Sequence, residues 1–490
     1  MKVRLHRAGH RAAAKHNRLR NLVLVLGLGL LGTVSLPAGA LETAWVLTTD
    51  YGTFGRVRAF AMDSPWTVTA DLATIPGDPA GRHHDDLVYV VGRSSANLIQ
   101  IYDPAAGFSL VREFSLGSGL NPQDIAFDAR GDAYVSCYDQ AVLLRVDISS
   151  GLILDSFDTS SFADADGLPE TAWLQTLGDR LYITCQKLDR NYYYAPSGPG
   201  ALLVFDMEAE QWVDMDPVEP GIQPIELQGG APYTRIEVYR HGAEGPTLRV
   251  GCVGFYGLQD GGLEQVDPVA GVSLGYLVTE AQLGGDIIGF TGTRAGSAHV
   301  LVSDSSFDTS LRRVNLVTGQ VTVLDSAHGY FHADVAYDGG FQLYLADRTL
   351  GASGLRVFDT VSGAELTAGP LPTGLPPFQF VLPFNGGFTP VTGPVPTAGR
   401  LRLAAACPNP CNPRSTLKVS GSPGSRVQVQ VLDLRGRRLL RDSLLLDAAG
   451  SALFRFEGRD QAGRDLPAGL YRVTTQGREG FAARSVILLK

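Results

Sequence analysis

A repeated pattern of short apolar strands recurs along most of the chain. Seven segments, each ending in a small or polar residue, follow one another at intervals of about 45 residues, with one longer interval after the fourth segment. The segments are WVLTT (45–49), VYVVG (88–92), AYVSC (133–137), LYITC (181–185), LRVGC (248–252), HVLVS (299–303) and LYLAD (343–347). The pattern predicts a fold that is built from one repeating unit.

A second row of strands follows the first in phase, and its members end in Asp or Asn. These end residues are Asp103, Asp147, Asp206, Asp267, Asn315 and Asp359. In five of the six copies a glycine stands four residues later. A carboxylate or amide at this place caps a tight turn through the backbone, while the glycine takes the left-handed conformation. We therefore interpret these acidic residues as hairpin corners and not as a catalytic set.

A further short strand usually precedes each member of the first row, as in QDIAFD (123–128) and ADVAYD (333–338). Each copy thus holds about four strands, without helical periodicity. Four-stranded units at this period predict a β-propeller over residues 41–384, and seven copies predict seven blades. The unpartnered segment FQFVLP (378–383) is expected to pair beside residues 45–49 and to close the ring, which removes an exposed edge.

The N-terminus predicts export. A basic opening leads into the apolar run LVLVLGLGLL (22–31) and then into Ala38-Gly39-Ala40, the order that is typical of a secretory signal peptide over residues 1–40. The apolar run is too short for a permanent membrane anchor, and no second run of spanning length follows. The mature chain is expected outside the cell or on the outer cell surface, without a transmembrane segment.

Charge divides the chain into two parts. Residues 41–400 carry a net charge of −24, whereas residues 401–490 carry +8, which indicates two separately built modules. The acidic body argues against nucleic acid as a partner and is more compatible with divalent cations or neutral glycans.

Residues 385–404 read as a Pro/Gly/Thr-rich linker. The following segment shows period-two alternation in RVQVQVLDLRG (426–436), and three further strand-like stretches follow it. These features predict a small β-sandwich over residues 405–490. The fold class expected for the whole chain is therefore all-β, a seven-bladed β-propeller followed by a small Ig-like β-sandwich.

Two family resemblances accompany this interpretation. The cycle NPQDIAFDARGDAYVSCYDQAVLLRVDISSGLILDSF (121–157) resembles the YVTN and NHL type of bacterial β-propeller, in which a proline-led inner strand, a Gly-Asp turn, a Tyr-Val strand and an Asp-x-x-x-Gly corner recur. The fourth copy departs from this pattern through the insertions 189–200 and 217–232. The shared motifs are structural and imply no particular activity.

The tail is similar to the immunoglobulin-like modules of the flagellar hook-capping (FlgD) type and to the type A C-terminal sorting domains of type IX secretion. The matching residues include Pro408, Asn409, Pro410, Asn412, Pro413, Gly436, Gly469, Tyr471 and the terminal Lys490. The resemblance implies that residues 405–490 engage secretion machinery and are then cleaved or attached to the cell surface. The tail departs from the family where Cys411 replaces the usual Phe and Phe456 replaces the usual Trp.

Five cysteines occur in the chain. Cys407 and Cys411 can form a disulfide if a turn brings their Cα atoms into range, and the alternative is a free cysteine that underfills the core. Cys137, Cys185 and Cys252 hold equivalent places in successive copies, and we interpret them as small buried hydrophobic residues and not as metal ligands.

Six acidic and histidine residues are candidates for one mouth of the central channel. They are Asp124, Asp286, His332, Asp334, His83 and His84. Such a ring is suited to a ligand, to calcium or to a transition metal. The alternative is that each Asp accepts hydrogen bonds from backbone donors of the next blade. Tyr192, Tyr193 and Tyr194 form a second candidate patch that stacks on a sugar or peptide, or else packs over the blade.

No Gly-rich phosphate loop sits between a strand and a helix, no HExxH motif occurs, and no nucleophile elbow between a strand and a helix is visible in the sequence. The first hypothesis is an exported, non-catalytic, monomeric propeller that binds a protein or glycan and needs no cofactor. One alternative is a metal-dependent hydrolase or lactonase with His332, Asp334, Asp286 and Asp124 around a single cation. Another alternative is a passive surface-layer component.

Overall fold

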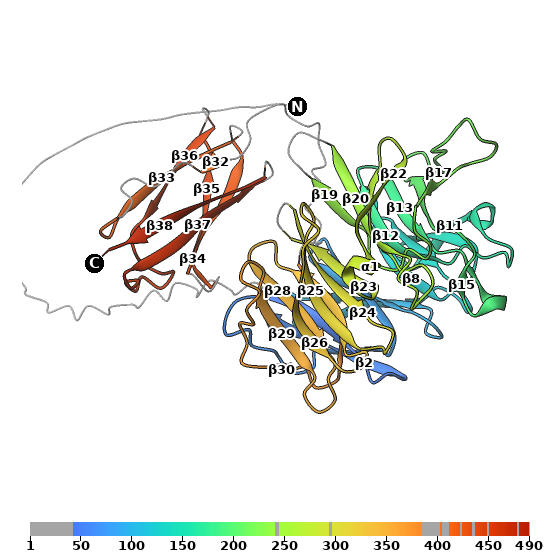
Figure 1. Cartoon of the computed structure of the whole chain (residues 1–490), viewed down its shortest axis with the longest axis horizontal. Coiled ribbons are helices and arrows are strands. Elements are labelled where there is room, and N and C mark those ends of the chain that lie inside the picture. The colour runs from blue at the N-terminus through green and yellow to red at the C-terminus, as the bar shows by residue number, and fades with distance from the viewer. Residues whose placement is uncertain are drawn as a thin grey trace, which may run out of the picture. The chain divides into compact units, whose positions relative to one another are not determined.

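The computed structural model describes residues 43–240, 245–293, 296–383, 402–403, 411–421, 424–433, 437–447, 450–477 and 480–489. The predicted signal peptide and most of the predicted linker lie outside these residues. Within the described part of the chain, no helix is both long and apolar enough to cross a membrane. The structure is nearly all β (Figure 1).

The described residues between 43 and 381 contain seven sheets of four or five strands, besides the two-stranded sheet of β14 and β15. Sheet 1 holds β1 (Thr43–Thr48), β2 (Phe54–Ala61), β3 (Ala73–Pro76) and β31 (Pro377–Val381); sheet 2 holds β4 (Pro79–His84), β5 (Leu87–Gly92), β6 (Leu98–Asp103) and β7 (Ser109–Ser115); sheet 3 holds β8 (Pro122–Phe127), β9 (Ala133–Cys137), β10 (Val142–Asp147) and β11 (Leu152–Asp158). Sheet 4 holds β12 (Thr171–Leu177), β13 (Arg180–Cys185), β16 (Ala201–Asp206), β17 (Gln211–Trp212) and β18 (Ile225–Glu226).

The remaining three sheets repeat the antiparallel order of sheets 2 and 3. Sheet 5 holds β19 (Glu237–Arg240), β20 (Pro246–Cys252), β21 (Gly262–Asp267) and β22 (Val272–Thr279); sheet 6 holds β23 (Asp286–Gly292), β24 (Ser297–Ser303), β25 (Thr309–Asn315) and β26 (Val321–Ala327); sheet 7 holds β27 (His332–Tyr337), β28 (Gln342–Asp347), β29 (Gly354–Asp359) and β30 (Leu371–Pro372). Short elements in the connections are η1 (Ser160–Phe162), β14 (Leu188–Asp189), η2 (Arg190–Tyr192), β15 (Ala195–Pro196) and α1 (Glu280–Leu283).

The innermost strands form a closed ring. In the order β4, β8, β12, β19, β23, β27 and β31, each strand contacts the next, and β31 contacts β4 again. Buried apolar side chains fill the space between each pair of neighbouring sheets, so that every core cluster draws on two consecutive sheets. This arrangement of stacked sheets is that of a β-propeller, in which burial between sheets supplies most of the stability.

The closing strand lies where the sequence predicted it. β31 pairs antiparallel with β1, with Val46 opposite Phe380 and Trp45 opposite Val381. β31 is also tied to both neighbouring sheets, because Asp334 of β27 accepts the Phe380 N–H at 2.8 Å and the Gln379 side chain accepts the Gly81 N–H at 3.0 Å. The prediction of closure by residues 378–383 is confirmed.

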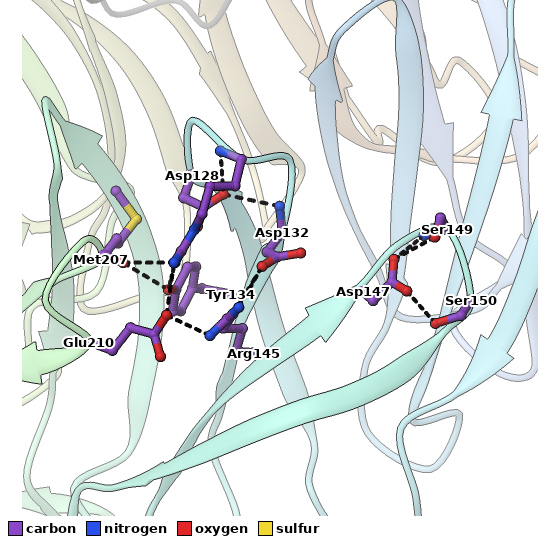
Figure 2. A network of polar contacts seen from close by, with 10 residues as sticks. Asp128, Asp132, Tyr134, Arg145, Asp147, Ser149, Ser150, Met207 and Glu210 are labelled. Carbon is purple, nitrogen blue, oxygen red and sulfur yellow. Dashed lines mark hydrogen bonds and ion pairs between the residues drawn. The ribbon is translucent and has the colours of Figure 1, made fainter.

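The Asp corners also behave as predicted. Asp103 accepts the N–H groups of Ala105 and Ala106, and Asp359 accepts those of Val361 and Ser362. The glycines at the fourth place have positive φ, for example 71° at Gly107. In Figure 2 the Asp147 carboxylate is held by Ser149 and Ser150 in the same kind of turn.

The described residues between 402 and 488 form two further sheets with a core of their own. One sheet holds β32 (Arg402–Leu403), β33 (Ser415–Ser420) and β36 (Ser451–Phe456), and the other holds β35 (Arg438–Leu445), β34 (Arg426–Leu432), β37 (Gly469–Gly477) and β38 (Gly480–Leu488). As the alternation predicted, Val427, Val429 and Val431 all face the core. Leu403 of β32, within the range predicted as linker, is buried in that core.

Candidate functional site

A cavity of about 440 Å³ lies inside the ring of innermost strands and draws lining residues from all seven of them. Its volume is typical of pockets that hold small ligands. The lining is rich in three kinds of side chain. These are the arginines Arg82, Arg93, Arg235 and Arg348, the aromatic residues Tyr138, Trp173, Tyr233, Tyr330 and Phe378, and the amides Gln123, Gln175, Gln186 and Gln379.

Three of the four cavity arginines are neutralised by an aspartate. The Arg82 Nε donates to the Asp124 carboxylate at 2.8 Å, and the Arg93 Nε donates to Asp78 at 3.0 Å. The Arg235 guanidinium lies 3.3 Å from Asp334 and 5.3 Å from the centre of the Trp173 ring. These ion pairs hold innermost strands in place and leave little charge for a ligand.

Arg348 is the exception among the four. Within the described residues its guanidinium has no carboxylate within ion-pair distance, and its buried Nε has no hydrogen-bond acceptor. The guanidinium carbon lies 5.8 Å from the ring centre of Tyr51 and 5.7 Å from that of Tyr330, so two aromatic rings flank the cation.

The three candidate aspartates do not form one site. Asp124 is fully buried and accepts the Leu174 N–H at 2.9 Å, while Asp334 accepts the Phe380 N–H. Both bonds reach the next sheet, as the alternative interpretation expected. Asp286 instead accepts the Gly257 N–H at 2.7 Å, from the preceding sheet. Burial raises the pKa of Asp286 and Asp334 above the usual value, and Arg235 partly offsets the effect at Asp334.

The candidate histidines also contact neighbouring side chains. His332 is fully buried with its Nε2 3.1 Å from Asp325. His83 lines the cavity but stacks on Trp45, and His84 stacks on Phe127 with ring centres 4.0 Å apart. Burial lowers the pKa of His83 and His84, which favours their neutral forms at neutral pH.

The four channel-mouth candidates of the metal hypothesis therefore have separate partners in the structure, and a ligand role for the channel-mouth residues stays a prediction. Asp124, Asp286, His332 and Asp334 each bond to a different partner, and they do not converge on one point. Among the residues that the structure describes, no group of three or more His, Cys, Asp or Glu side chains is placed to hold a metal ion.

Other acidic residues form ion pairs within and between the sheets. In Figure 2 Glu210 and Asp132 approach Arg145, whose Nη1 lies 2.6 Å from Glu210 and whose Nε lies 3.0 Å from Asp132. The Tyr134 hydroxyl reaches the Met207 carbonyl of the next sheet at 3.4 Å. The Glu210 and Met207 contacts join sheets 3 and 4, while the Asp132 contact lies within sheet 3, as expected for structural carboxylates.

Glu237 is the one glutamate in the cavity wall as described. It accepts the Gly292 N–H at 2.6 Å, and burial raises its pKa to about 7. A carboxyl with this pKa carries a partial charge at neutral pH, and the cations that act on it are Arg249 and Arg235.

The tyrosine patch is exposed. Tyr192, Tyr193 and Tyr194 have exposed fractions of 63%, 92% and 53%, so their rings are accessible at the surface, and binding of a sugar or peptide there stays a prediction. Tyr194 lies 5.8 Å from Arg190, whose Nε donates to the buried Glu170 at 2.8 Å. The patch does not line the cavity.

The buried cysteines match their interpretation. Cys137, Cys185 and Cys252 are fully buried, and burial raises the pKa of Cys137 and Cys185 to about 12. Such thiols stay protonated and pack as small apolar groups.

In the tail, Cys411 lies in the core of the module, where its N–H donates to the Ile487 carbonyl at 2.8 Å. Phe456 packs against Tyr471, with ring centres 5.9 Å apart, and the Tyr471 hydroxyl donates to Pro467 at 2.6 Å. Asn412 and Pro413 follow Cys411, and Gly469 begins β37. The other residues of the predicted motif lie outside the described residues; they are Cys407, Pro408, Asn409, Pro410, Gly436 and Lys490. The disulfide therefore stays a prediction.

Sequence reasoning missed the arginines and aromatic residues of the cavity. A positional signal was nevertheless present. Four lining residues directly follow a first-row strand, namely Arg93, Tyr138, Gln186 and Arg348. Because equivalent positions of a propeller meet at the same end of the ring, this row could have identified the cavity.

No family model matches the chain, and no curated protein matches it significantly. Solved structures that it resembles are β-propeller-like proteins. PorZ, described as an essential bacterial surface component of the type IX secretion system of Porphyromonas gingivalis, is 12% identical with a TM-score of 0.40; the match covers 89% of this chain and 64% of PorZ. A putative 6-phosphogluconolactonase from Bacteroides fragilis is 12% identical with a TM-score of 0.48, over 69% of this chain and 96% of that one. Apo AztD from Citrobacter koseri is 13% identical with a TM-score of 0.41, over 69% and 98%.

Proposed function

We propose that the chain is an exported, non-catalytic seven-bladed β-propeller that binds a glycan or protein ligand in its central cavity. The single observation that carries the proposal is the cavity of about 440 Å³, lined by aromatic, amide and arginine side chains from all the innermost strands. Aromatic faces beside hydrogen-bonding amides are typical of ligand sites.

The chemistry of the wall favours binding over catalysis. Asp124 and Asp334 serve as ion-pair partners and backbone acceptors, and His332 is buried against Asp325. Catalysis by general acids and bases needs such groups within hydrogen-bond reach of a shared substrate position. The alternative of a metal-dependent hydrolase has no such support from these residues.

Residues 405–490 act in this proposal as a module for secretion or surface attachment. The sequence match to the sorting modules supports this role, together with a core that draws only on residues 403–488. Export through residues 1–40 rests on the signal-peptide pattern.

The test of binding uses the mature chain, residues 41–490, on arrays of oligosaccharides and peptides. We expect ligands whose affinity falls about tenfold or more in Trp173→Ala, because the Trp173 ring lines the cavity. Leu110→Ala, on the exposed outer strand β7, is the matched control and is expected to bind like the wild type. Unchanged binding by Trp173→Ala, or no binding on either array, would overturn the proposal.

Two further measurements address the alternatives. A stoichiometric tightly bound metal ion that is lost in Asp334→Asn would favour the hydrolase over the binder. Fractionation of cells that express the chain with and without residues 405–490 tests the module, whose deletion is expected to abolish delivery to the surface or the medium. A passive surface-layer component would stay with the envelope and bind no ligand on the arrays.

A further inference from the structure

We propose that the ligand of the cavity is an acidic oligosaccharide and that Arg348 receives its carboxylate. This inference rests on the proposed function and narrows the ligand to one chemical class. Its starting point is the charge balance of the cavity, in which Arg82, Arg93 and Arg235 are each paired with an aspartate while Arg348 is not.

The position of Arg348 suits the binding of an anion. It directly follows β28, and its backbone N–H donates to the Phe331 carbonyl at 2.7 Å, which fixes the start of the side chain. The buried Nε lacks an acceptor within the described residues. A buried donor without a partner is costly, and a planar guanidinium meets a carboxylate through two parallel hydrogen bonds. A carboxylate on the ligand would remove this cost.

Aromatic side chains cluster at the same end of the ring. Tyr51 follows β1, Tyr256 and Phe307 follow β20 and β24, and Tyr233 and Tyr330 precede β19 and β27. Their exposed fractions lie between 37% and 62%, so parts of their surfaces remain accessible. Tyr330 lies close enough to Tyr233 and Tyr256 for both to raise its pKa, after the larger effect of burial. Aromatic faces with hydroxyl groups suit the apolar faces and hydroxyls of sugar rings.

The distribution of charge selects a ligand with few negative charges. Residues 41–400 carry a net charge of −24, so a polyanion such as nucleic acid would be repelled by the body of the protein. Arg348 supplies one unpaired positive charge in the cavity, whereas the amides Gln123 and Gln186 already bond to protein partners and add only neutral polar surface. One carboxylate on an otherwise neutral, hydroxyl-rich chain matches this lining better than an acidic peptide, which offers fewer hydroxyls.

The experiment measures binding of the mature chain to oligosaccharides that contain uronic or sialic acid. Each is compared with its methyl ester and with its carboxyl-reduced, neutral counterpart. We expect the acidic form to bind at least about tenfold more tightly than both, because a charge-assisted pair is lost in the neutral forms. The preference should weaken as salt is added.

Arg348→Met tests the residue itself. We expect it to lose the preference for the acidic form about tenfold or more, while affinity for the neutral form stays within about twofold. Arg348→Lys keeps the charge but not the planar fork, and should recover only part of the preference. The control is Arg112→Met, which removes an exposed arginine of β7 and should leave all affinities unchanged. The melting temperature of Arg348→Met should not be lower than that of the wild type, because the substitution removes no ion pair.

The outcomes distinguish a failure of the acidic-ligand proposal from a failure of the proposed function. Equal binding of the acidic and neutral forms, or an unchanged preference in Arg348→Met, would overturn this inference and leave the proposed glycan binder in place. Binding of an acidic peptide but of no oligosaccharide would do the same and would leave a protein binder. Binding of neither class would overturn the proposed function as well.

Discussion

Phe380→Ala is expected to destabilise the ring at the point where it closes. Phe380 is 2% exposed and lies with its ring centre 5.8 Å from Phe60 and 6.2 Å from Tyr344, in the core shared by sheets 7 and 1. Truncation of a buried Phe removes its apolar contacts and leaves a cavity, at a cost of about 3–5 kcal/mol in the free energy of unfolding.

Guanidinium unfolding of the mature chain, followed by tryptophan fluorescence, measures this loss. The four tryptophans all lie before residue 213, and Trp45 lies in β1 directly beside the closing strand, so the signal reports on the sheets and not on the tail. The control Leu110→Ala removes a side chain that is 51% exposed and should change stability by no more than about 0.5 kcal/mol.

Hydrogen exchange locates the effect. In Phe380→Ala, the β1 amides that pair with β31 should lose protection before the amides of sheet 3 do. A stability equal to that of the control, or uniform loss of protection across all sheets, would refute the view that this contact seals the ring.

Three further predictions concern buried polar groups and the tail. Asp124→Ala should cost about 3–5 kcal/mol by thermal unfolding, because it leaves the Arg82 cation buried without its partner, and Arg82→Met in the same chain should restore part of the loss. Burial raises the pKa of Glu280 from 4.5 to about 7, so the native state binds more protons than the unfolded state between these pH values. The free energy of unfolding should therefore fall by up to about 3 kcal/mol as the pH rises through that window. Glu280→Gln should flatten this dependence of stability on pH. Cys411→Phe introduces into a core position the residue that the similar sorting modules carry there, and it should raise the melting temperature if the site is underfilled, whereas a fall would indicate that the site is already full or that Cys407 is its disulfide partner.

The sequence predicted most of the propeller because its signals are local and repeated. Each first-row strand and each Asp turn is determined by residues close in sequence. The pattern of the repeats also showed that the first copy lacked one strand of its sheet. The segment 378–383 was the remaining candidate, and β31 fills that place. Hydroxyl contacts such as that from Tyr344 to the Met62 carbonyl, at 2.9 Å, join the last sheet to the first and could not be read from one copy alone.

The candidate site was harder to predict because the sequence does not show how charges pair across the ring. Asp124 and Asp334 were singled out as acids, but their partners Arg82 and Arg235 lie on other sheets. The same limit hid Arg348, whose significance depends on the lack of a partner among the described residues. The aromatic residues near it come from connections whose lengths differ between copies, so no fixed spacing marks them.

The pairing of β31 with β1 has a consequence for how the chain matures. The first strand described here cannot complete its sheet until nearly the whole repeat region has emerged from the ribosome or from a translocation pore. Until then the early strands keep an edge without a hydrogen-bonded partner. A chaperone that binds unfolded chains would be most useful during that interval. In the export that we propose, this delay would keep the polypeptide unfolded until its passage through the membrane is almost finished.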